Sequence, residues 1–350
     1  MGTGILSGIA RGRVDRWLAE HVPGAVPPFD YRAFAGGRSN LTYAVTDREA
    51  RRFVLRRPPL GHVLASAHDM RREHRTISAL APTVVAVAQP LAFCADPAVN
   101  DAPFYVMDFV EGVVIRNEED ADRYLDEAAR GEASRSLVDV LAHLHALDPG
   151  AVGLGDLGRG DGYVARQLRR WHGQFEQSKV EDIPALDEVH QRLASRVPPQ
   201  RRTSVVHGDY RLENCILNPD GTVRAVIDWE LCTLGDPLAD LGWFAAYWVE
   251  SGETGAHPPG GVAAMPAGFL DRHALVARYV ERTSADLEDF DFYLAFAYWK
   301  RACVAAGVSA RYRAGVMADE AMVAHAETFS EQVQRLVDQA RAVCDRWLDS

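Results

Sequence analysis

Three oxygen-bearing side chains are closely spaced in the stretch VVHGDYRLENCILNPDGTVRAVIDWE, residues 205–230. Asp209 follows the apolar end of an expected strand, Asn214 comes five residues later, and Asp228 ends a second apolar run. A carboxylate beside a buried strand costs free energy unless a cation or a hydrogen-bond donor meets it. The turn-forming residues 218–221 predict a hairpin, which would bring Asn214 and Asp228 near each other. Two carboxylates and one amide oxygen suit a hard cation, so we predict a Mg²⁺ site.

A second group of residues, near the N-terminus, could hold the phosphates that usually complete such a magnesium site. Arg56 lies in the strand-like run 52–59, and Glu73 lies in a helix-like run after it. A strand cation paired with a helical glutamate is how kinase-like folds hold the α- and β-phosphates. Arg57 is adjacent and points the other way in a strand, so the pattern leaves both arginines open as the cation. A glycine turn between two strand-like runs could cover the phosphates with its backbone N–H groups, and it comprises Gly36, Gly37, Arg38, Ser39 and Asn40.

The elements that must position these groups divide the chain into two parts. Strand-like runs dominate residues 31–112, with a helix expected over 65–80 between them. Helical patterns dominate from residue 118 onward, beginning with one strong pattern over 118–147. We predict an α+β fold with a β-rich N-lobe over residues 1–108 and a mainly helical C-lobe over 109–350. The joint between two lobes is a favoured place for a ligand cleft.

The order of these motifs resembles the two-lobed protein-kinase-like fold, and more closely the aminoglycoside phosphotransferase family, also called the phosphotransferase enzyme family. HGDYRLEN, residues 207–214, is similar to the catalytic loop of that family, and VIDWE, residues 226–230, is similar to its metal-binding segment. GDPLADLGW, residues 235–243, also fits the family. The stretches GGRSNLTY and FVLRRPP look like the subgroup related to the kinase-like domain that is fused to acyl-CoA dehydrogenases. The resemblance covers most of the chain.

The resemblance implies a role for each matching residue. Asp209 would accept or orient the proton of an acceptor hydroxyl, while Asn214 and Asp228 would hold Mg²⁺. Arg56, oriented by Glu73, would contact the α- and β-phosphates of ATP. The backbone of a hinge would meet the adenine, and this hinge comprises Met107, Asp108, Phe109 and Val110.

Supporting roles follow for residues around this core. In the family, aspartates after the metal-binding segment brace the catalytic loop, and Asp236 and Asp240 are the matching residues. Trp243 and Lys300 lie in helical patterns and could belong to the core or line the acceptor pocket. For His145, in the helical run LAHLHALD, packing or capping is the expected role, because the two histidines of this run lie on different helix faces.

Two departures separate this chain from protein kinases. The metal-binding segment reads Asp228-Trp229-Glu230 instead of Asp-Phe-Gly, and no activation loop ending in Ala-Pro-Glu occurs. Both features fit small-molecule kinases better than kinases that modify proteins. An arginine in place of the usual strand lysine keeps a fixed charge that can bind phosphate in a bidentate manner.

The composition sets limits on partners and location. The 350 residues carry a formal net charge of −11, which argues against nucleic acid and anionic membranes as partners. The five cysteines are scattered and form no Cys-x-x-Cys, which is typical of a cytoplasmic protein with reduced thiols. No apolar run reaches the length of about 18 residues that a membrane span needs.

Together these features predict an ATP- and Mg²⁺-dependent small-molecule kinase that phosphorylates a hydroxyl. The resemblance to the domain fused to acyl-CoA dehydrogenases favours a metabolic hydroxy acid or its thioester as the acceptor. An aminoglycoside is the next candidate, and carboxylates clustered at the acceptor site would favour it because the drug is a polycation. A nucleotide-binding module without turnover is a different class of function, and the intact Asp209, Asn214 and Asp228 argue against it.

Overall fold

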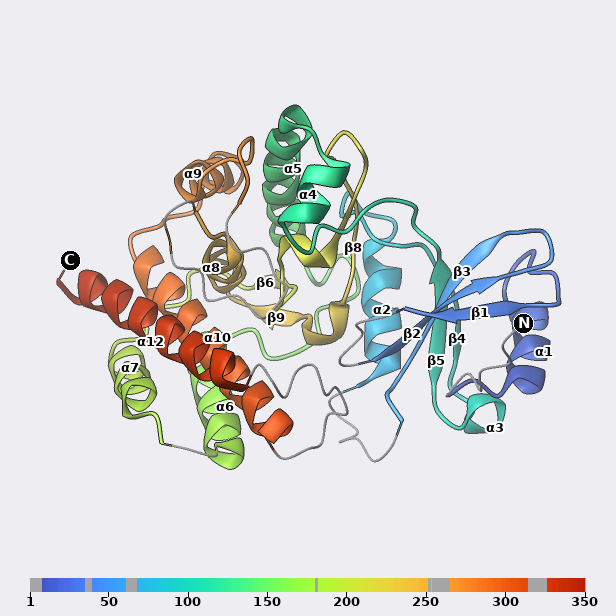
Figure 1. Cartoon of the computed structure of the whole chain (residues 1–350), viewed down its shortest axis with the longest axis horizontal. Helices are drawn as coiled ribbons and strands as arrows, with labels where there is room; N and C mark the ends of the chain where they lie inside the picture. The colour runs from blue at the N-terminus through green and yellow to red at the C-terminus, as the bar shows by residue number, and fades with distance from the viewer. Residues whose placement is uncertain are drawn as a thin grey trace. The chain divides into compact units, whose positions relative to one another are not determined.

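The computed structural model describes residues 8–34, 40–60, 68–179, 182–250, 253, 265–313 and 326–349 (Figure 1). The chain folds into two compact units. The first comprises Met1–Glu111 and Arg224–Cys232, and the second comprises Gly112–Val223 and Thr233–Ser350. The predicted division into lobes after residue 108 stays a prediction. The first unit is not one continuous stretch of chain, because it also contains residues 224–232.

The described part of the first unit is built on an antiparallel sheet with the strand order β1-β2-β3-β5-β4. Its strands are β1 (Asp30–Ala33), β2 (Leu41–Thr46), β3 (Arg52–Arg57), β4 (Pro90–Cys94) and β5 (Phe104–Asp108). Helices α1 (Arg11–His21) and α2 (Met70–Leu80) lie on opposite sides of the sheet in Figure 1, and α3 (Pro97–Asn100) precedes β5.

Alternation along β3 decides which residues meet which helix. Phe53 and Leu55 pack into one core with Trp17 and Leu18 of α1. Val54, between them, and Arg56, after them, point to the other face, because successive side chains of a strand point to opposite faces, and Arg56 meets Glu73 of α2 there. Arg56 therefore belongs to the face that α2 covers.

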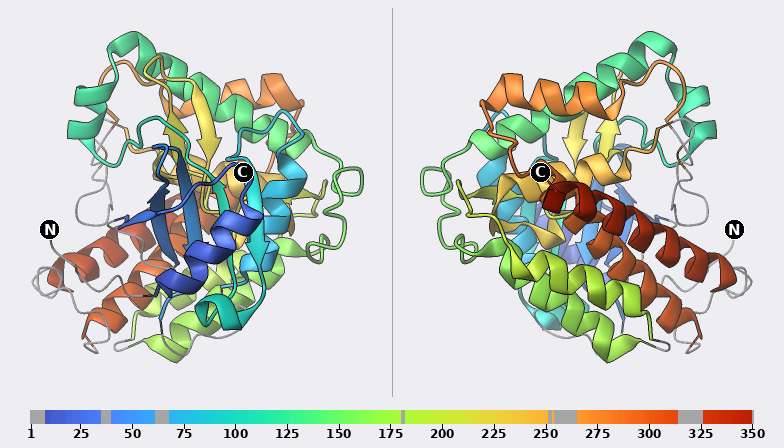
Figure 2. Two further views of the ribbon diagram at one scale, coloured as in Figure 1. Left: turned by 90° about the vertical axis from the view of Figure 1, so that its right-hand side faces the viewer. Right: turned by 90° about the vertical axis from the view of Figure 1, so that its left-hand side faces the viewer.

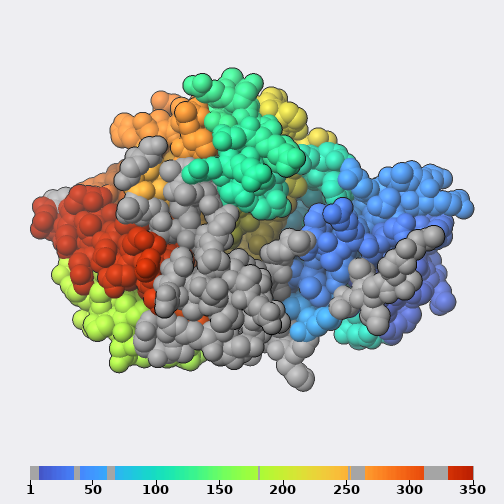
Figure 3. Space-filling model, viewed as in Figure 1, coloured from blue at the N-terminus to red at the C-terminus, as the bar shows by residue number. Residues whose placement is uncertain are grey.

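The second unit is mainly helical. Its helices are α4 (Glu118–Tyr124), α5 (Glu127–Ala146), α6 (Tyr163–Ser178), α7 (Pro184–Ser195), α8 (Pro237–Tyr247), α9 (Arg272–Thr283), α10 (Phe290–Arg313) and α12 (Ala326–Asp349). Helix α10 packs against α6, α7, α8 and α12, and Figure 2 shows α12 running beside α10. Helix α12 lies at the surface of this unit (Figure 3). The antiparallel sheet unit and the helical unit confirm the predicted α+β class.

Short strands carry the motif residues. Strand β6 (Ser204–Val206) pairs with β9 (Thr233–Gly235), and the short helix η1 (Leu212–Asn214) precedes β7 (Cys215–Leu217). The predicted turn after β7 is present, because the amide of Asn218 donates to the carbonyl of Thr222 and Gly221 has a φ of +89°. Strand β8 (Val223–Val226) and the short helix η2 (Trp229–Leu231) follow.

The predicted helix over 118–147 is two helices. Helix α4 ends at Tyr124, and Asp126 caps α5 by accepting a hydrogen bond from the amide of Ala129 at 2.8 Å. The side chain of an N-cap aspartate satisfies an amide that a continuous helix would bond internally, so the break has a local cause. Throughout the described ranges, no helix combines the length and the apolar character that crossing a membrane requires.

Candidate active site

The carboxylate of Asp209 is held by side chains from two elements of the second unit. Its Oδ1 accepts a hydrogen bond from the indole Nε1 of Trp243 on α8 at 2.8 Å, and its Oδ2 accepts one from Nδ2 of Asn214 at 2.8 Å. The guanidinium Nε of Arg211 lies 3.4 Å from Oδ1. The Asp209 side chain is 20% exposed, so the carboxylate is oriented yet reachable.

Asn214 is suited to bind a cation with its remaining oxygen. Its Nδ2 donates both to the Asp209 carboxylate and to the Asp209 carbonyl, each at 2.8 Å. Both bonds use the amide nitrogen, so Oδ1 takes part in neither of them. An amide oxygen fixed in this way is a ligand of the type that Mg²⁺ prefers.

Asp240 braces the start of the 207–214 loop. Its Oδ2 accepts from the amide of His207 at 2.6 Å, and its Oδ1 accepts from the amide of Gly208 at 2.8 Å. Gly208 has a φ of +85°, a backbone region that favours glycine and lets both consecutive amides converge on one carboxylate. The predicted bracing role of Asp240 is confirmed.

Asp236 does not contact this loop, and the prediction for it is wrong. Its Oδ1 accepts from the amide of Leu238, which caps α8, and its Oδ2 accepts from the hydroxyl of Tyr293 at 2.7 Å. Asp236 stands immediately before the first residue of α8, and this N-cap position turns its side chain back toward the helix.

His145 contacts the brace residue Asp240, which the sequence did not reveal. Its Nε2 lies 3.4 Å from Oδ2 of Asp240, and its Nδ1 is 2.7 Å from the hydroxyl of Tyr279 on α9. Burial alone would raise the pKa of Asp240, but the hydrogen bond and charge of His145, together with the Gly208 amide, lower it. The run LAHLHALD gave no sign of this, because the partner of His145 lies 95 residues away.

In the first unit, Arg56 joins two carboxylates. Its Nε donates to Glu73 on α2 at 2.8 Å, and its Nη2 donates to Oδ1 of Asp228 at 2.5 Å. Glu73 is buried and also accepts from the hydroxyl of Tyr105 at 3.0 Å and from Nδ2 of Asn40 at 2.9 Å. Burial alone would lower the pKa of Arg56, but the charges of Glu73 and Asp228 raise it above its ordinary value.

The two strand arginines have different partners. Arg57 faces away from Glu73 and donates to the backbone carbonyls of Pro58 at 3.1 Å, Asn100 at 3.4 Å and Gly8. Arg56 is the arginine that pairs with the helical glutamate.

Asp228 has an unusual backbone conformation. Its φ of +67° and ψ of +58° place a residue other than glycine in the left-handed region, where η2 begins. Such a conformation costs about 1 kcal/mol or more and concentrates at functional sites. The strain presents the carboxylate to Arg56, and the side chain remains 31% exposed.

The remaining predicted nucleotide contacts are placed as follows. Gly36, Gly37, Arg38 and Ser39 lie outside the described residues. The side chain of Asn40 bridges Glu73 and Glu230. In the predicted hinge, Met107 and Asp108 are the last two residues of β5. The centroid of the Phe109 ring lies 4.0 Å from the guanidinium carbon of Arg52, and Val110 is partly exposed.

Replacing Arg56 with methionine is expected to weaken nucleotide binding by roughly tenfold or more, because a phosphate would lose a charge-assisted hydrogen bond worth about 1.5–3 kcal/mol. Isothermal titration with ATP and Mg²⁺ measures the change. Arg57→Met is the matched variant, and it should leave the dissociation constant nearly unchanged. Equal losses in the two variants would contradict the assignment of Arg56.

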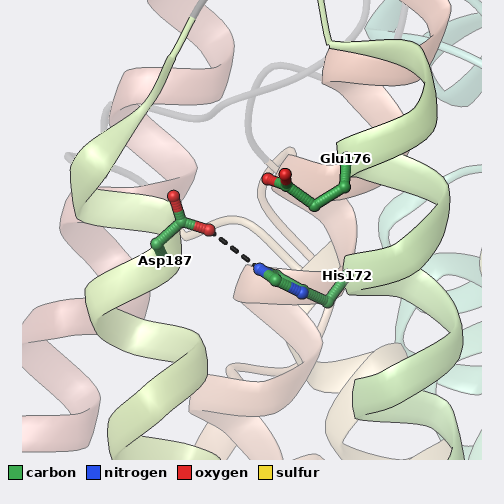
Figure 4. A group of neighbouring side chains, drawn as sticks. All are labelled: His172, Glu176 and Asp187. Carbon is green, nitrogen blue, oxygen red and sulfur yellow. Dashed lines mark hydrogen bonds and ion pairs between the residues drawn. The ribbon is translucent and has the colours of Figure 1, made fainter.

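Another group of titratable side chains lies on α6 and α7. Nε2 of His172 is 2.8 Å from Oδ1 of Asp187, and the carboxylate of Glu176 is on the same side (Figure 4). The ammonium of Lys179 pairs with Glu176 at 3.0 Å. His172 and Asp187 share a hydrogen bond, Lys179 and Glu176 form an ion pair, and the sequence gave no signal for this group.

Comparison with known proteins gives a family match over most of the chain. Residues 30–264 match the model of the phosphotransferase enzyme family. Acyl-CoA dehydrogenase family member 11 of Gallus gallus is 32% identical over 96% of this chain and 44% of its own length. Acyl-CoA dehydrogenase family member 10 of Mus musculus is 32% identical over 82% of this chain and 27% of its own length. The chain thus spans less than half the length of these curated relatives.

Solved structures show the same fold. A protein of Ralstonia eutropha JMP134 classed with the aminoglycoside phosphotransferases superposes with a TM-score of 0.79 at 31% identity, covering 95% of this chain and 98% of that one. Choline kinase of Cryptosporidium parvum superposes with a TM-score of 0.61 at 12% identity, covering 96% and 99%. The predicted kinase-like fold is confirmed.

Proposed function

Because the chain belongs to the phosphotransferase enzyme family, we propose that it is an ATP- and Mg²⁺-dependent kinase of a small hydroxylated molecule. The observation that carries this proposal is the arrangement of Asp209. Its carboxylate accepts hydrogen bonds from Trp243 and Asn214, and Asp240 holds the backbone amides immediately before it. A carboxylate oriented in this way is suited to accept the proton of an acceptor hydroxyl.

The proposed reaction is an in-line transfer. The acceptor oxygen forms a bond to the γ-phosphorus of ATP while the bond between that phosphorus and the β–γ bridging oxygen breaks, and ADP leaves with that oxygen. Asp209 takes up the proton that the hydroxyl loses. Arg56, held by Glu73, binds the α- and β-phosphates, and the backbone of residues 107–110 meets the adenine.

Asn214 and Asp228 are the residues that we propose to hold Mg²⁺. The amide oxygen of Asn214, which takes part in neither of the two bonds above, and the partly exposed carboxylate of Asp228 are both oxygen ligands of the kind that this ion prefers. The bound ion would neutralise charge on the phosphoryl oxygens. When it binds, Asp228 must share or exchange its hydrogen bond from Arg56.

Two arginines lie near Asp209 within the second unit and would suit an anionic acceptor. Arg211 lies beside the Asp209 carboxylate and also pairs with Glu213. The guanidinium carbons of Arg211 and of the buried Arg301 lie 5.1 and 4.0 Å from the centroid of the Tyr247 ring. A polycationic aminoglycoside needs carboxylates in such a place. We therefore propose a hydroxy acid or its thioester, in agreement with the relatives named for acyl-CoA dehydrogenases.

The test is a phosphorylation screen of a metabolite library that includes hydroxy acids, their coenzyme A thioesters and aminoglycosides, read by mass spectrometry. Transfer to hydroxylated anions supports the proposal, and transfer to aminoglycosides alone would replace the proposed acceptor. Stabilisation by ATP and Mg²⁺ without transfer to any acceptor would identify a nucleotide-binding module instead.

Asp228→Asn is expected to weaken the Mg²⁺-dependent part of nucleotide binding, because an amide carries no charge to attract the ion. Asparagine tolerates the left-handed backbone, so the fold should persist. A Mg²⁺ titration of nucleotide binding measures the shift. A titration curve that matches the unmodified protein would show that Asp228 does not bind the metal.

A further inference from the structure

Lys300 is a buried cation that the proposed reaction does not yet use. It lies on α10, only 5% of its surface is exposed, and its Nζ donates to the carbonyl of Gly208 at 3.0 Å. The same ammonium lies 3.9 Å from the ring centroid of Trp243. A buried ammonium costs free energy unless it is paired, and these two contacts are its direct compensation.

Trp243 connects this cation to Asp209. One face of its indole contacts the Lys300 ammonium, while its Nε1 donates to Oδ1 of Asp209. Lys300 thus touches both the backbone that precedes Asp209 and the ring that orients the Asp209 carboxylate. Close packing of α8 on α10 makes this possible, because a Cβ at Gly242 would lie only 2.7 Å from the carbonyl oxygen of Tyr293.

The use of lysine at this position is unusual for the chain. The sequence has 38 lysines and arginines, and only Lys179 and Lys300 are lysines. Lys179 is partly exposed and pairs with two acidic side chains. A lysine ammonium is a compact point charge, whereas a guanidinium is a planar fork. The narrow space between the Gly208 carbonyl and the Trp243 ring suits the smaller cation.

Charged groups from three neighbouring elements face Lys300. Burial lowers its pKa to about 8, while the carboxylates of Asp209 and Asp240 oppose this effect and Arg170 of α6 adds to it. The ring of Trp171 lies 5.4 Å from the ammonium. The carboxylates of Asp209 and Asp240 therefore stabilise the charged form of Lys300, and its burial destabilises that form.

We propose that Lys300 is a positioning residue for Asp209, acting through the Gly208 carbonyl and the Trp243 indole to hold the carboxylate toward an acceptor hydroxyl. This inference rests on the proposed phosphotransferase function.

The test compares Lys300→Met with Lys179→Met. Methionine keeps the unbranched apolar stem and removes the charge. In Lys300→Met we expect kcat to fall by about 10- to 100-fold, as small misplacements of reacting groups do, with little change in the KM for ATP. The melting temperature should not fall, because the cost of burying a charge is removed. Lys179→Met should match the unmodified protein in kcat.

Two further readouts separate positioning from general packing. Hydrogen exchange at the amides of residues 207–209 should become faster in Lys300→Met and stay unchanged in Lys179→Met. In the unmodified protein kcat should decrease as the pH rises through about 8, where Lys300 loses its proton, and this decrease should be absent in Lys300→Met. Carbon-13 labelling of lysine Cε gives two side-chain signals, so NMR can assign the titration to Lys300 directly.

The outcomes decide the inference independently of the proposed function. Unchanged kcat and unchanged exchange in Lys300→Met would overturn it, as would a lower melting temperature that accounts for the whole loss of activity. If the unmodified protein transfers phosphate to no acceptor, the proposed function fails. In that case the exchange comparison alone decides whether Lys300 holds the loop: faster exchange only in Lys300→Met supports it, and equal exchange removes it.

Discussion

Asp209→Ala is expected to reduce kcat by about 10²–10⁴-fold, the usual contribution of a positioned general base. The variant loses the group that we propose to receive the hydroxyl proton, and it leaves the donors of Trp243 and Asn214 without their acceptor. Nucleotide affinity should stay nearly intact, because the proposed phosphate contact comes from Arg56, which Glu73 holds in place. Steady-state kinetics with an acceptor from the screen, combined with ATP titration, measures both quantities.

The control for this experiment is Asp161→Ala, which removes an exposed carboxylate of the same unit. It should retain kcat and ATP affinity. If Asp209→Ala loses nucleotide binding in place of turnover, the role assigned to Asp209 is wrong.

Asp240→Asn is expected to lower the free energy of unfolding by about 2–4 kcal/mol, because buried backbone amides lose good acceptors. An asparagine replaces one of the two accepting oxygens with an NH₂ donor, so one of the amides of His207 and Gly208 loses its present acceptor. Activity should also fall, since these amides fix the backbone leading to Asp209. Chemical denaturation followed by tryptophan fluorescence measures stability, and Asp161→Asn is the exposed counterpart.

The stability that Asp240→Asn removes is expected to become smaller at low pH. The pKa of Asp240 is lowered in the folded protein, so the folded state binds fewer protons than the unfolded state near that pKa. Its stabilising contribution is complete above the ordinary aspartate pKa of about 4 and disappears as the pH falls through the lower folded value. The stability difference between the unmodified protein and Asp240→Asn should therefore be constant from pH 7 to 5 and narrow below about pH 4. A constant difference down to pH 2 would show that ionisation of Asp240 is not its source.

The sequence was most informative where local patterns set the geometry. Period-two runs predicted the strands that carry Arg56 and Met107, and the Asn-Pro-Asp-Gly pattern predicted the turn at Asn218. The family resemblance supplied Asp240 as a brace, and the hydrogen bonds to His207 and Gly208 confirm it.

Contacts between residues distant in sequence could not be predicted in the same way. Arg56 and Arg57 are equivalent in composition and spacing, and only the packing of α1 and α2 on opposite faces separates their partners. His145 and Lys300 both lie in helical patterns, where a polar residue near an apolar face has no visible partner. Their partners, Asp240 and Gly208, lie more than 90 residues away. The pairing of Asn214 and Asp228 on one metal ion stays a prediction.

The presence of residues 224–232 in the first unit has a practical consequence for any attempt to isolate its proposed nucleotide contacts. Within that unit the amide of Val226 donates to the carbonyl of Ala86, and Arg72 donates to the carbonyl of Cys232. A gene fragment that stops at residue 111 would lack these bonds and would deprive Arg56 of Asp228 and Glu230. Such a fragment would expose an excess positive charge beside Glu73, and a permuted gene that splices the later segment onto the earlier one is the better design.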